Sequence, residues 1–320
     1  MLVIAHRGAS GHRPEHTLAA YELAARLGAD HLEPDLVSTA DGVLVARHEP
    51  EIGATTDIAA RPEFADRRTT KVIDGEPRTG WFVEDLTLDE LRRVRAVERI
   101  PRIRPANCAH DGRHGVPTFA EILALRERLS GELGREIGVY PETKHPSYFA
   151  SIGLALEPAL VAELSAADLS RPDAPVFVQS FETANLRLLR GMTPVPLVQL
   201  IAARGRPADG SPRSYADLAS PAGLAGIARY AAAVGVHKSL VLPRWGGPAS
   251  PLVPDAHDTG LAVHAWTFRD ESRFLPDEVR RAGGAVVEYG PYLQAGVDGV
   301  FSDHPRTAVA AREMLLSRAG

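Results

Sequence analysis

The chain has 320 residues, 44% of them hydrophobic and 24% charged, which is typical of a soluble globular protein. Its 36 basic and 41 acidic residues give a net charge of −5, which disfavours a nucleic-acid binder that works by neutralising phosphates. No stretch approaches the roughly 18 uninterrupted apolar residues expected of an integral membrane segment. Cys108 is the only cysteine, so an internal disulfide is excluded.

The first residues, Met-Leu-Val-Ile-Ala-His-Arg-Gly, predict a strand that runs directly into polar residues. This stretch is too short for a signal peptide and lacks the basic start that such peptides have. We therefore expect a cytoplasmic protein if Met1 is the natural start, and a periplasmic or secreted one if a signal peptide was removed. The sequence does not predict an oligomeric state.

Apolar strand-like runs alternate with helical stretches along the chain, a pattern typical of a parallel α/β fold. Eight such runs predict strands: 2–5, 30–36, 137–142, 175–180, 196–200, 234–237, 262–267 and 298–302. Eight strands with intervening helices predict a (β/α)8 TIM barrel that occupies residues 1–320 as a single domain. A doubly wound open sheet is the alternative architecture.

Several expected helices carry readable end signals. The patterns Thr87-Leu88-Asp89-Glu90 and Thr118-Phe119-Ala120-Glu121 are capping boxes that open helices. A helix over 16–27 is expected to stop at Gly28, and the last helix is expected to begin after Pro305.

Residues 50–117 do not fit the alternation of strands and helices. They are rich in Arg, Asp, Thr and Pro and contain one short helical pattern over 88–97. We predict an insertion between the second and third barrel strands, lying on the upper face of the barrel. Trp81 and Phe82 are expected to give it a small core of its own.

The stretch from His31 to Glu49 predicts a β-hairpin. The Asp41-Gly42 pair lies between two apolar runs and is the strongest short-range hairpin signal. A turn centred there places Glu33 opposite His48, and Asp35 opposite Ala46. Because directly paired residues share a face, two carboxylates and an imidazole are expected on one side of this ribbon.

Functional residues of a TIM barrel lie at the carboxyl ends of its strands. Glu33, Asp35 and Glu142 stand there in apolar contexts, where an ionised carboxylate is costly unless it is paired or metal-bound. All-oxygen ligation favours Mg²⁺ or Ca²⁺ over zinc. The alternative is that these carboxylates form ion pairs with arginine or lysine.

His6 and His48 are placed beside the carboxylates by the expected barrel and hairpin. Two imidazoles that flank an anionic centre can divide acid and base catalysis between them. Zinc ligation by histidine and carboxylate is the competing interpretation. Of the other histidines, only His16 and His145 lie near the same rim, and the rest are read as structural.

Cations and aromatic residues complete the expected rim. Arg7 follows His6, and Lys144 follows Glu142 by two residues, so both can bind a phosphate ester. Structural salt bridges to the nearby carboxylates are the alternative. Phe181 and Trp266 are expected either to wall an apolar part of a substrate or to fill the core.

These motifs, in this order, resemble those of the glycerophosphodiester phosphodiesterases. The matching motifs are His6-Arg7-Gly8 with Pro14-Glu15, Glu33-Pro34-Asp35, His48, Glu142-Thr143-Lys144, Ser180-Phe181, Trp266-Thr267 and Gly296-Val297-Asp298-Gly299. They span the chain from Val3 to Pro305. The versions Pro-Glu-His-Thr at 14–17 and Val-Pro-Thr-Phe at 116–119 are similar to the periplasmic-type bacterial branch.

The resemblance implies a TIM barrel that hydrolyses glycerophosphodiesters to glycerol 3-phosphate and an alcohol, with one Ca²⁺ or Mg²⁺ ion. By position, it implies that the metal ligands are Glu33, Asp35 and Glu142, that the acid–base pair is His6 and His48, and that the phosphate is held by Arg7 and Lys144. The sequence departs from the family at His16, where asparagine is frequent, and at Glu49, where aspartate is frequent.

The mechanism expected for such a site uses the glycerol 2-hydroxyl of the substrate as nucleophile and passes through a cyclic phosphate. One alternative is a phospholipase D-like lyase acting on lysophospholipids, which needs an apolar rim that the polar 50–117 segment does not supply. The other is a non-catalytic barrel that binds phosphodiesters or cations. The sequence does not predict the preferred alcohol, and it does not distinguish Ca²⁺ from Mg²⁺.

Overall fold

The computed structural model describes residues 1–319 of the chain. Its main sheet has eleven strands: β1 (Leu2–His6), β2 (His31–Glu33), β3 (Asp35–Ser38), β4 (Leu44–Ala46), β7 (Gly138–Val139), β8 (Glu142–Thr143), β9 (Val178–Ser180), β10 (Leu197–Ile201), β11 (Ala233–His237), β12 (Ala262–Phe268) and β13 (Gly299–Ser302). A separate antiparallel ribbon consists of β5 (Thr69–Ile73) and β6 (Glu76–Gly80).

The main sheet follows the order β4-β3-β8-β9-β10-β11-β12-β13-β1-β2-β7, and every pair except β3 with β4 is parallel. β2 and β3 are two parts of one strand divided at Pro34, and β7 and β8 are parts of the next, before and after Pro141. Proline interrupts the ladder because it has no backbone N–H to donate. Since β2 pairs with β7 and β3 with β8, the eight predicted strands close into a TIM barrel, not an open sheet.

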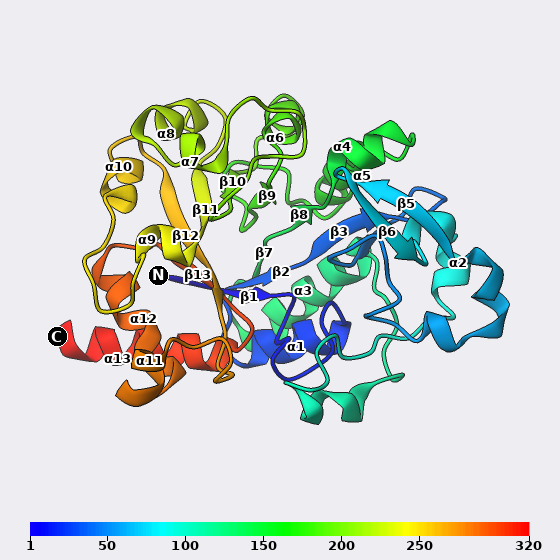
Figure 1. Cartoon of the computed structure of the whole chain (residues 1–320), viewed down its shortest axis with the longest axis horizontal. Helices are drawn as coiled ribbons and strands as arrows, with labels where there is room; N and C mark the ends of the chain where they lie inside the picture. Colours follow the sequence, from blue (N-terminus) through cyan, green and yellow to red (C-terminus); the bar gives the residue numbers. More distant parts are fainter. Residues whose placement is uncertain (320) are drawn as a thin grey trace.

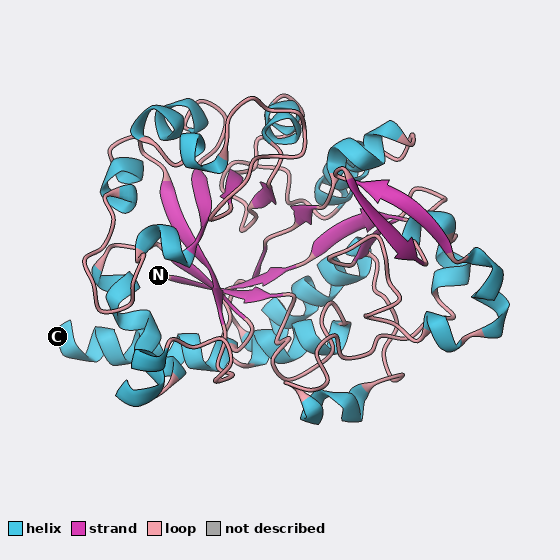
Figure 2. Ribbon diagram, in the orientation of Figure 1, coloured by secondary structure: helices cyan, strands magenta, loops and turns pink. Residues whose placement is uncertain are grey.

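Helices surround this sheet (Figures 1 and 2). Outside the 50–117 segment they are α1 (Leu18–Arg26), α3 (Phe119–Leu133), α4 (Pro146–Ser151), α5 (Leu156–Ala166), α6 (Thr183–Arg190), α7 (Tyr215–Leu218), α8 (Pro221–Ile227), α9 (Lys238–Val241), α10 (Leu252–His257), α11 (Asp277–Ala282), α12 (Ala285–Gln294) and α13 (Pro305–Ala319). Within residues 1–319, no helix combines the length and apolar character needed to cross a membrane.

The predicted capping signals are present. The Thr118 side chain accepts from the Glu121 backbone N–H, and the Glu121 side chain accepts from the Thr118 backbone N–H. Helix α3 begins directly after Thr118. Thr87 caps α2 in the same way. Gly28 follows α1 with a φ of 93°, which a residue with a Cβ atom rarely adopts.

Two hydrophobic clusters form the core. The barrel interior is filled by Ile4, Tyr140, Val198, Ala233 and Phe301, so the barrel is packed and is not a pore. The larger cluster lies between the strands and the surrounding helices. The polar groups that Tyr140 and His264 carry into the barrel interior are paired, since Tyr140 Oη lies 2.7 Å from Nδ1 of the buried His264.

The 50–117 segment contains η1 (Ile58–Ala60), η2 (Pro62–Arg67), β5, β6, η3 (Val83–Asp85), α2 (Leu88–Leu91) and η4 (Pro105–His110). The prediction of a separate small core was wrong: Ile58, Phe64 and Val83 belong to the same large cluster as the barrel residues. The reason is that the segment pairs with the barrel backbone, as where Ala40 N–H donates to Leu86 O at 2.9 Å. The boundaries of the insertion stay a prediction.

The predicted register of the β3–β4 hairpin was wrong by one residue. Leu36 pairs with Ala46, and the Asp35 carbonyl accepts from Arg47 N–H at 2.9 Å. Glu33 and His48 therefore do not face each other across the ribbon.

The shift arises at the turn, which has three residues instead of two. Thr39 N–H donates to Val43 O at 3.0 Å, and Gly42 between them has a φ of 80°. A three-residue loop with a left-handed glycine is the next most common hairpin connection, and it moves every later pair by one position.

Candidate active site

A cavity of about 140 Å³ opens at the carboxyl ends of the barrel strands. Side chains from β1, β2, β8, β9, β10, β12 and β13, and from the loop after β4, converge on it although they are far apart in sequence. Its lining is His6, Arg7, Glu33, His48, Glu142, Gln179, Phe181, Leu200, Trp266, Thr267, Arg269 and Phe301. This is the end of a TIM barrel at which active sites lie.

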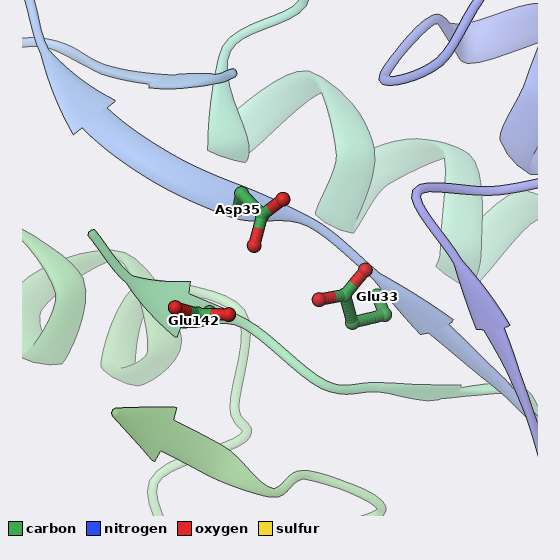
Figure 3. A group of neighbouring side chains, drawn as sticks. All are labelled: Glu33, Asp35 and Glu142. Atoms are coloured by element: carbon green, nitrogen blue, oxygen red, sulfur yellow. The ribbon is translucent and has the colours of Figure 1, made fainter. Parts of the chain in front are cut away.

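Glu33, Asp35 and Glu142 form a compact buried cluster (Figure 3). One carboxylate oxygen from each lies within 4.8 Å of the others. Asp35 and Glu142 are direct partners in the parallel β3–β8 pair, so their side chains leave the sheet together. Asp35 Oδ1 is buried and has no hydrogen-bond partner within residues 1–319.

The electrostatics of this cluster reflect burial and mutual repulsion. Burial, with the neighbouring Asp35 and Glu142 carboxylates, holds the pKa of Glu33 well above 4.5. Burial also raises the pKa of Glu142, to about 7, although Lys144 opposes this. Burial opposes ionisation of Asp35 too, but Lys144, His48 and His16 hold its pKa well below 3.8.

Two buried neighbours fix the orientation of these carboxylates. His16 Nε2 lies 2.8 Å from Asp35 Oδ2, and Tyr21 Oη lies 2.7 Å from His16 Nδ1. Burial lowers the pKa of His16 to about 4, so it is neutral and donates to Asp35 through Nε2–H. Gln179 Nε2 donates to Glu33 Oε1 at 3.0 Å.

His6 is held by a carboxylate on its outer side. Its Nδ1 lies 2.6 Å from Asp303 Oδ1, and Arg104 and Arg269 donate to the other oxygen of Asp303 at 2.5 and 2.8 Å. Burial, together with Arg7, lowers the pKa of His6 below 6.5. With Nδ1 occupied by Asp303, Nε2 is the ring nitrogen left for a ligand in the cavity.

His48 has the same arrangement with a different carboxylate. Its Nδ1 lies 2.7 Å from Glu49 Oε1, and its Nε2 lies 3.2 Å from the Lys144 ammonium. An ammonium only donates, so Nε2 accepts and Nδ1 carries the proton. Burial, with Arg7 and Lys144, holds the pKa of His48 well below 6.5, which agrees with a neutral ring.

Arg7 and Lys144 both lie beside the carboxylate cluster. Arg7 Nη1 is 3.2 Å from Glu15 Oε1 and Arg7 Nε is 3.4 Å from Asp35 Oδ2, while its backbone N–H donates to Glu33 Oε2 at 2.8 Å. Lys144 Nζ donates to Glu142 Oε1 at 2.8 Å. The salt bridges weighed as an alternative are therefore present, and Arg7 also lines the cavity.

Phe181 and Trp266 form an aromatic wall. Their rings meet edge to face with centroids 5.7 Å apart, and the Trp266 indole N–H donates to Gly235 O at 3.0 Å. Phe181 and Glu142 also border a second cavity of about 490 Å³, which contains Lys144 and Tyr215. Glu142 and Phe181 therefore border both cavities.

Sequence reasoning assigned no role to several residues that support this site. Gln179 carried a signal, because it alternates with Phe177 and Phe181 and so shares their face of β9. Asp303 directly follows the eighth predicted strand, but no local pattern indicates that its carboxylate holds His6. Arg104 lies in the 50–117 segment, nearly 200 residues from Asp303, and no local pattern indicates that they meet.

His145 stands at the start of α4 and lies between two carboxylates. Its Nδ1 is 2.6 Å from Asp74 Oδ2, and its Nε2 is 3.8 Å from Glu49 Oε2. Burial alone would lower its pKa, but these carboxylates raise the pKa of His145 to about 9. The imidazolium is therefore the form present at neutral pH.

We expect this ion pair to make stability depend on pH. A histidine whose folded pKa lies above its unfolded value of 6.5 stabilises the fold fully below pH 6.5, and this stabilisation is lost as the pH rises through 9. Urea unfolding of the wild type and His145→Asn should differ by at most about 3 kcal/mol at pH 6 and converge above pH 9. A constant difference between pH 6 and 10 would contradict the assignment.

A TIM barrel with an acidic cluster, two carboxylate-held imidazoles and two cations at its mouth fits an enzyme of phosphate esters. The model of the "Glycerophosphoryl diester phosphodiesterase family" matches residues 6–307, and the chain belongs to this family. It is accordingly a glycerophosphodiester phosphodiesterase, a phosphoric diester hydrolase.

Individual relatives extend along almost the whole chain. A glycerophosphodiester phosphodiesterase, GDPD6, of Arabidopsis thaliana is 33% identical over 94% of this chain and 82% of its own length. A glycerophosphodiester phosphodiesterase of Haemophilus influenzae is 27% identical over 96% of this chain and 88% of its own.

A solved structure shows the same fold. It is an Oleispira antarctica phosphodiesterase in complex with the product sn-glycerol-3-phosphate. It superposes with a TM-score of 0.68 at 20% identity and covers 98% of this chain and 97% of its own.

Proposed function

We propose that the protein hydrolyses glycerophosphodiesters to glycerol 3-phosphate and an alcohol, using a divalent cation and two histidines. The observation that carries the proposal is the symmetry of His6 and His48 around one cavity. Each ring has its Nδ1 held by a carboxylate, Asp303 or Glu49, and each lines the cavity that also contains Glu33.

The cation would be held by Glu33, Asp35 and Glu142. The residues fit such an ion because three buried carboxylates lie within 4.8 Å, and Asp35 Oδ1 has no other partner in the described chain. An all-oxygen set suits Ca²⁺ or Mg²⁺. When bound, the ion supplies Lewis-acid stabilisation of the phosphate oxygens.

In the first step, one histidine removes the proton of the glycerol 2-hydroxyl. The resulting oxygen attacks phosphorus, and the other histidine, which enters the step as the imidazolium, gives its Nε2 proton to the departing alcohol. The P–O bond to the alcohol breaks as the new P–O bond closes a cyclic glycerol phosphate. In the second step, water opens this ring with the two histidines in exchanged roles, and glycerol 3-phosphate leaves.

Arg7 and Lys144 are proposed to bind the phosphate. Arg7 is already fixed by Glu15, and Lys144 by Glu142, so both cations are positioned before substrate arrives. Preorganised cations stabilise the negative charge that develops on phosphorus oxygens in the transition state. Phe181 and Trp266 would form the wall against an apolar part of the substrate.

The test is a coupled assay for glycerol 3-phosphate with glycerophosphodiesters of several alcohols. We expect release with added Ca²⁺ or Mg²⁺ and loss of release on chelation. Absence of turnover with every substrate and both metals would leave a binding barrel as the better interpretation.

Phosphorus NMR of the same reaction separates the hydrolase from a lyase. The hydrolase gives glycerol 3-phosphate, with a cyclic ester at most transient. A cyclic ester that accumulates as the final product, particularly from lysophospholipids, would replace the proposal with the lyase.

A further inference from the structure

A chain of charged contacts leads from His48 out of the reaction cavity. His48 bonds Glu49 at 2.7 Å, the other oxygen of Glu49 faces His145 Nε2 at 3.8 Å, and His145 Nδ1 bonds Asp74 at 2.6 Å. His145 Nε2 is buried and has no hydrogen-bond partner in the described chain. The only acceptor this chain of contacts offers Nε2 is the carboxylate that holds His48.

Both residues of the outer contact have a left-handed backbone. His145 has a φ of 48° and Asp74 has a φ of 52°, although neither is glycine. Left-handed conformations of such residues cost energy and persist where surrounding contacts enforce them. At Asp74 the two-residue Asp74-Gly75 turn of the hairpin itself requires positive φ, so only the backbone of His145 points to enforcement by side-chain contacts.

Asp74 lies at the turn of the β5–β6 hairpin, which is separate from the barrel sheet. A two-stranded hairpin is marginally stable without outside contacts. Lys71 ties this hairpin to Glu84 and Asp85 at 2.9 and 2.6 Å. The Asp74–His145 contact ties its tip to the start of α4, near the mouth of the barrel (Figure 1).

We propose that His145 and Asp74 are positioning residues for His48. The cationic His145 ring lies between two carboxylates and holds Glu49 from the side opposite His48. Asp74 holds His145 and thereby makes the β5–β6 hairpin part of the active-site support. This inference rests on the proposed function, because it gives His48 the role of acid or base.

The physical reason is that a carboxylate orients an imidazole only as well as it is itself oriented. The Glu49 side chain is 28% exposed, so without His145 it can turn towards water. His48 would then keep its place in the chain but lose its fixed ring orientation. Turnover needs that orientation more than substrate binding does, so kcat is the affected constant.

The experiment uses the full chain with His145→Asn, Asp74→Asn and the double variant. Asparagine tolerates the left-handed backbone, so each change removes the ion pair with little backbone cost. We expect His145→Asn to lower kcat about tenfold, within the range found for residues that support a metal's ligands, with KM changed less than about twofold. The double variant should have a kcat no lower than that of His145→Asn, because the single change already removes the contact between His145 and Asp74.

His257→Asn is the matched control. His257 also pairs with an aspartate, with Nε2 2.9 Å from Asp298 Oδ2, at the amino-terminal end of the barrel strands. It should leave kcat and KM unchanged. Equal kcat losses in His257→Asn and His145→Asn would show a nonspecific effect and overturn the inference.

A spectroscopic measurement makes the test independent of turnover. In metal-free protein with ¹⁵N-labelled histidine, His48 should show the Nδ1–H tautomer, assigned by its absence in His48→Ala. Lys144 keeps this tautomer in the variants, so we expect His145→Asn and Asp74→Asn to move the His48 Nδ1–H proton resonance upfield as its hydrogen bond to Glu49 weakens. An unchanged His48 signal in both variants overturns the inference, and so does wild-type kcat in both.

The two proposals fail in different ways. A wild type that releases no glycerol 3-phosphate under any condition contradicts the proposed function, whatever the variants do. A wild type that is active, with variants equally active, contradicts only the positioning role. If His145→Asn does not fold, Asp74→Asn alone carries the same expectations.

Discussion

Replacing His6 or His48 with alanine is expected to lower kcat by about 10²–10⁴-fold, the usual contribution of a positioned acid or base. Both rings line the cavity, and the cation would be held by three carboxylates and not by these rings. The loss should therefore appear in the steady-state kcat for glycerol 3-phosphate release. KM and cation affinity, measured by calorimetry, should change little.

The controls separate catalysis from folding. Asp303→Asn keeps the shape of the carboxylate that holds His6 but removes its charge, so its loss of kcat should be smaller than that of His6→Ala. Both alanine variants should unfold at nearly the wild-type temperature. Near-normal turnover in either alanine variant would remove that histidine from the mechanism.

The barrel was predictable because its strands are apolar runs separated by helices with clear caps. All eight predicted strands are present, and the capping boxes at Thr87 and Thr118 are where the sequence places them. The errors arose where a single residue changes the pairing. The hairpin register depends on whether the turn contains two or three residues, and Asp41-Gly42 is compatible with both.

The candidate site was predictable in so far as its residues lie at strand ends. Glu33, Asp35 and Glu142 come together although the hairpin register used to place two of them was wrong. They do so because the β3–β8 pair puts Asp35 beside Glu142, and Glu33 precedes Asp35 by two. The contacts that orient the histidines are less predictable, because those of Asp303 join residues far apart in the chain.

The acidic cluster predicts a second large effect, on stability as well as activity. A carboxyl group whose pKa is raised in the folded protein binds more protons there than in the unfolded chain. Stability of the metal-free protein should therefore fall as the pH rises above 4.5, the pKa of a glutamate in the unfolded chain. The part of this fall that is due to Glu142 should continue up to its folded pKa of about 7. Added Ca²⁺ or Mg²⁺ should raise the unfolding temperature most at the upper end of this window.

Glu33→Gln tests whether this behaviour belongs to a cation site. The variant loses one ligand charge and one source of repulsion, so metal-free protein should unfold at a higher temperature than wild type at pH 8. Added cation should then stabilise it little, and kcat should fall by more than about 10²-fold, beyond the loss typical when a residue supporting a metal's ligands is removed. Differential scanning calorimetry with and without cation, beside the activity assay, measures both.

Glu163→Gln provides the matched control for this experiment. Burial raises the pKa of Glu163 to about 7 as well, but this residue lies on α5 and does not line the reaction cavity. Its replacement should flatten part of the pH dependence while leaving stabilisation by cation and turnover intact. Two results would contradict a catalytic ion that relieves the repulsion among these carboxylates. One is stabilisation by cation and turnover in Glu33→Gln equal to those in Glu163→Gln, and the other is full turnover of the wild type in the presence of a chelator. The acidic cluster would then be held by Arg7 and Lys144 alone, and the phosphate would have to be bound elsewhere.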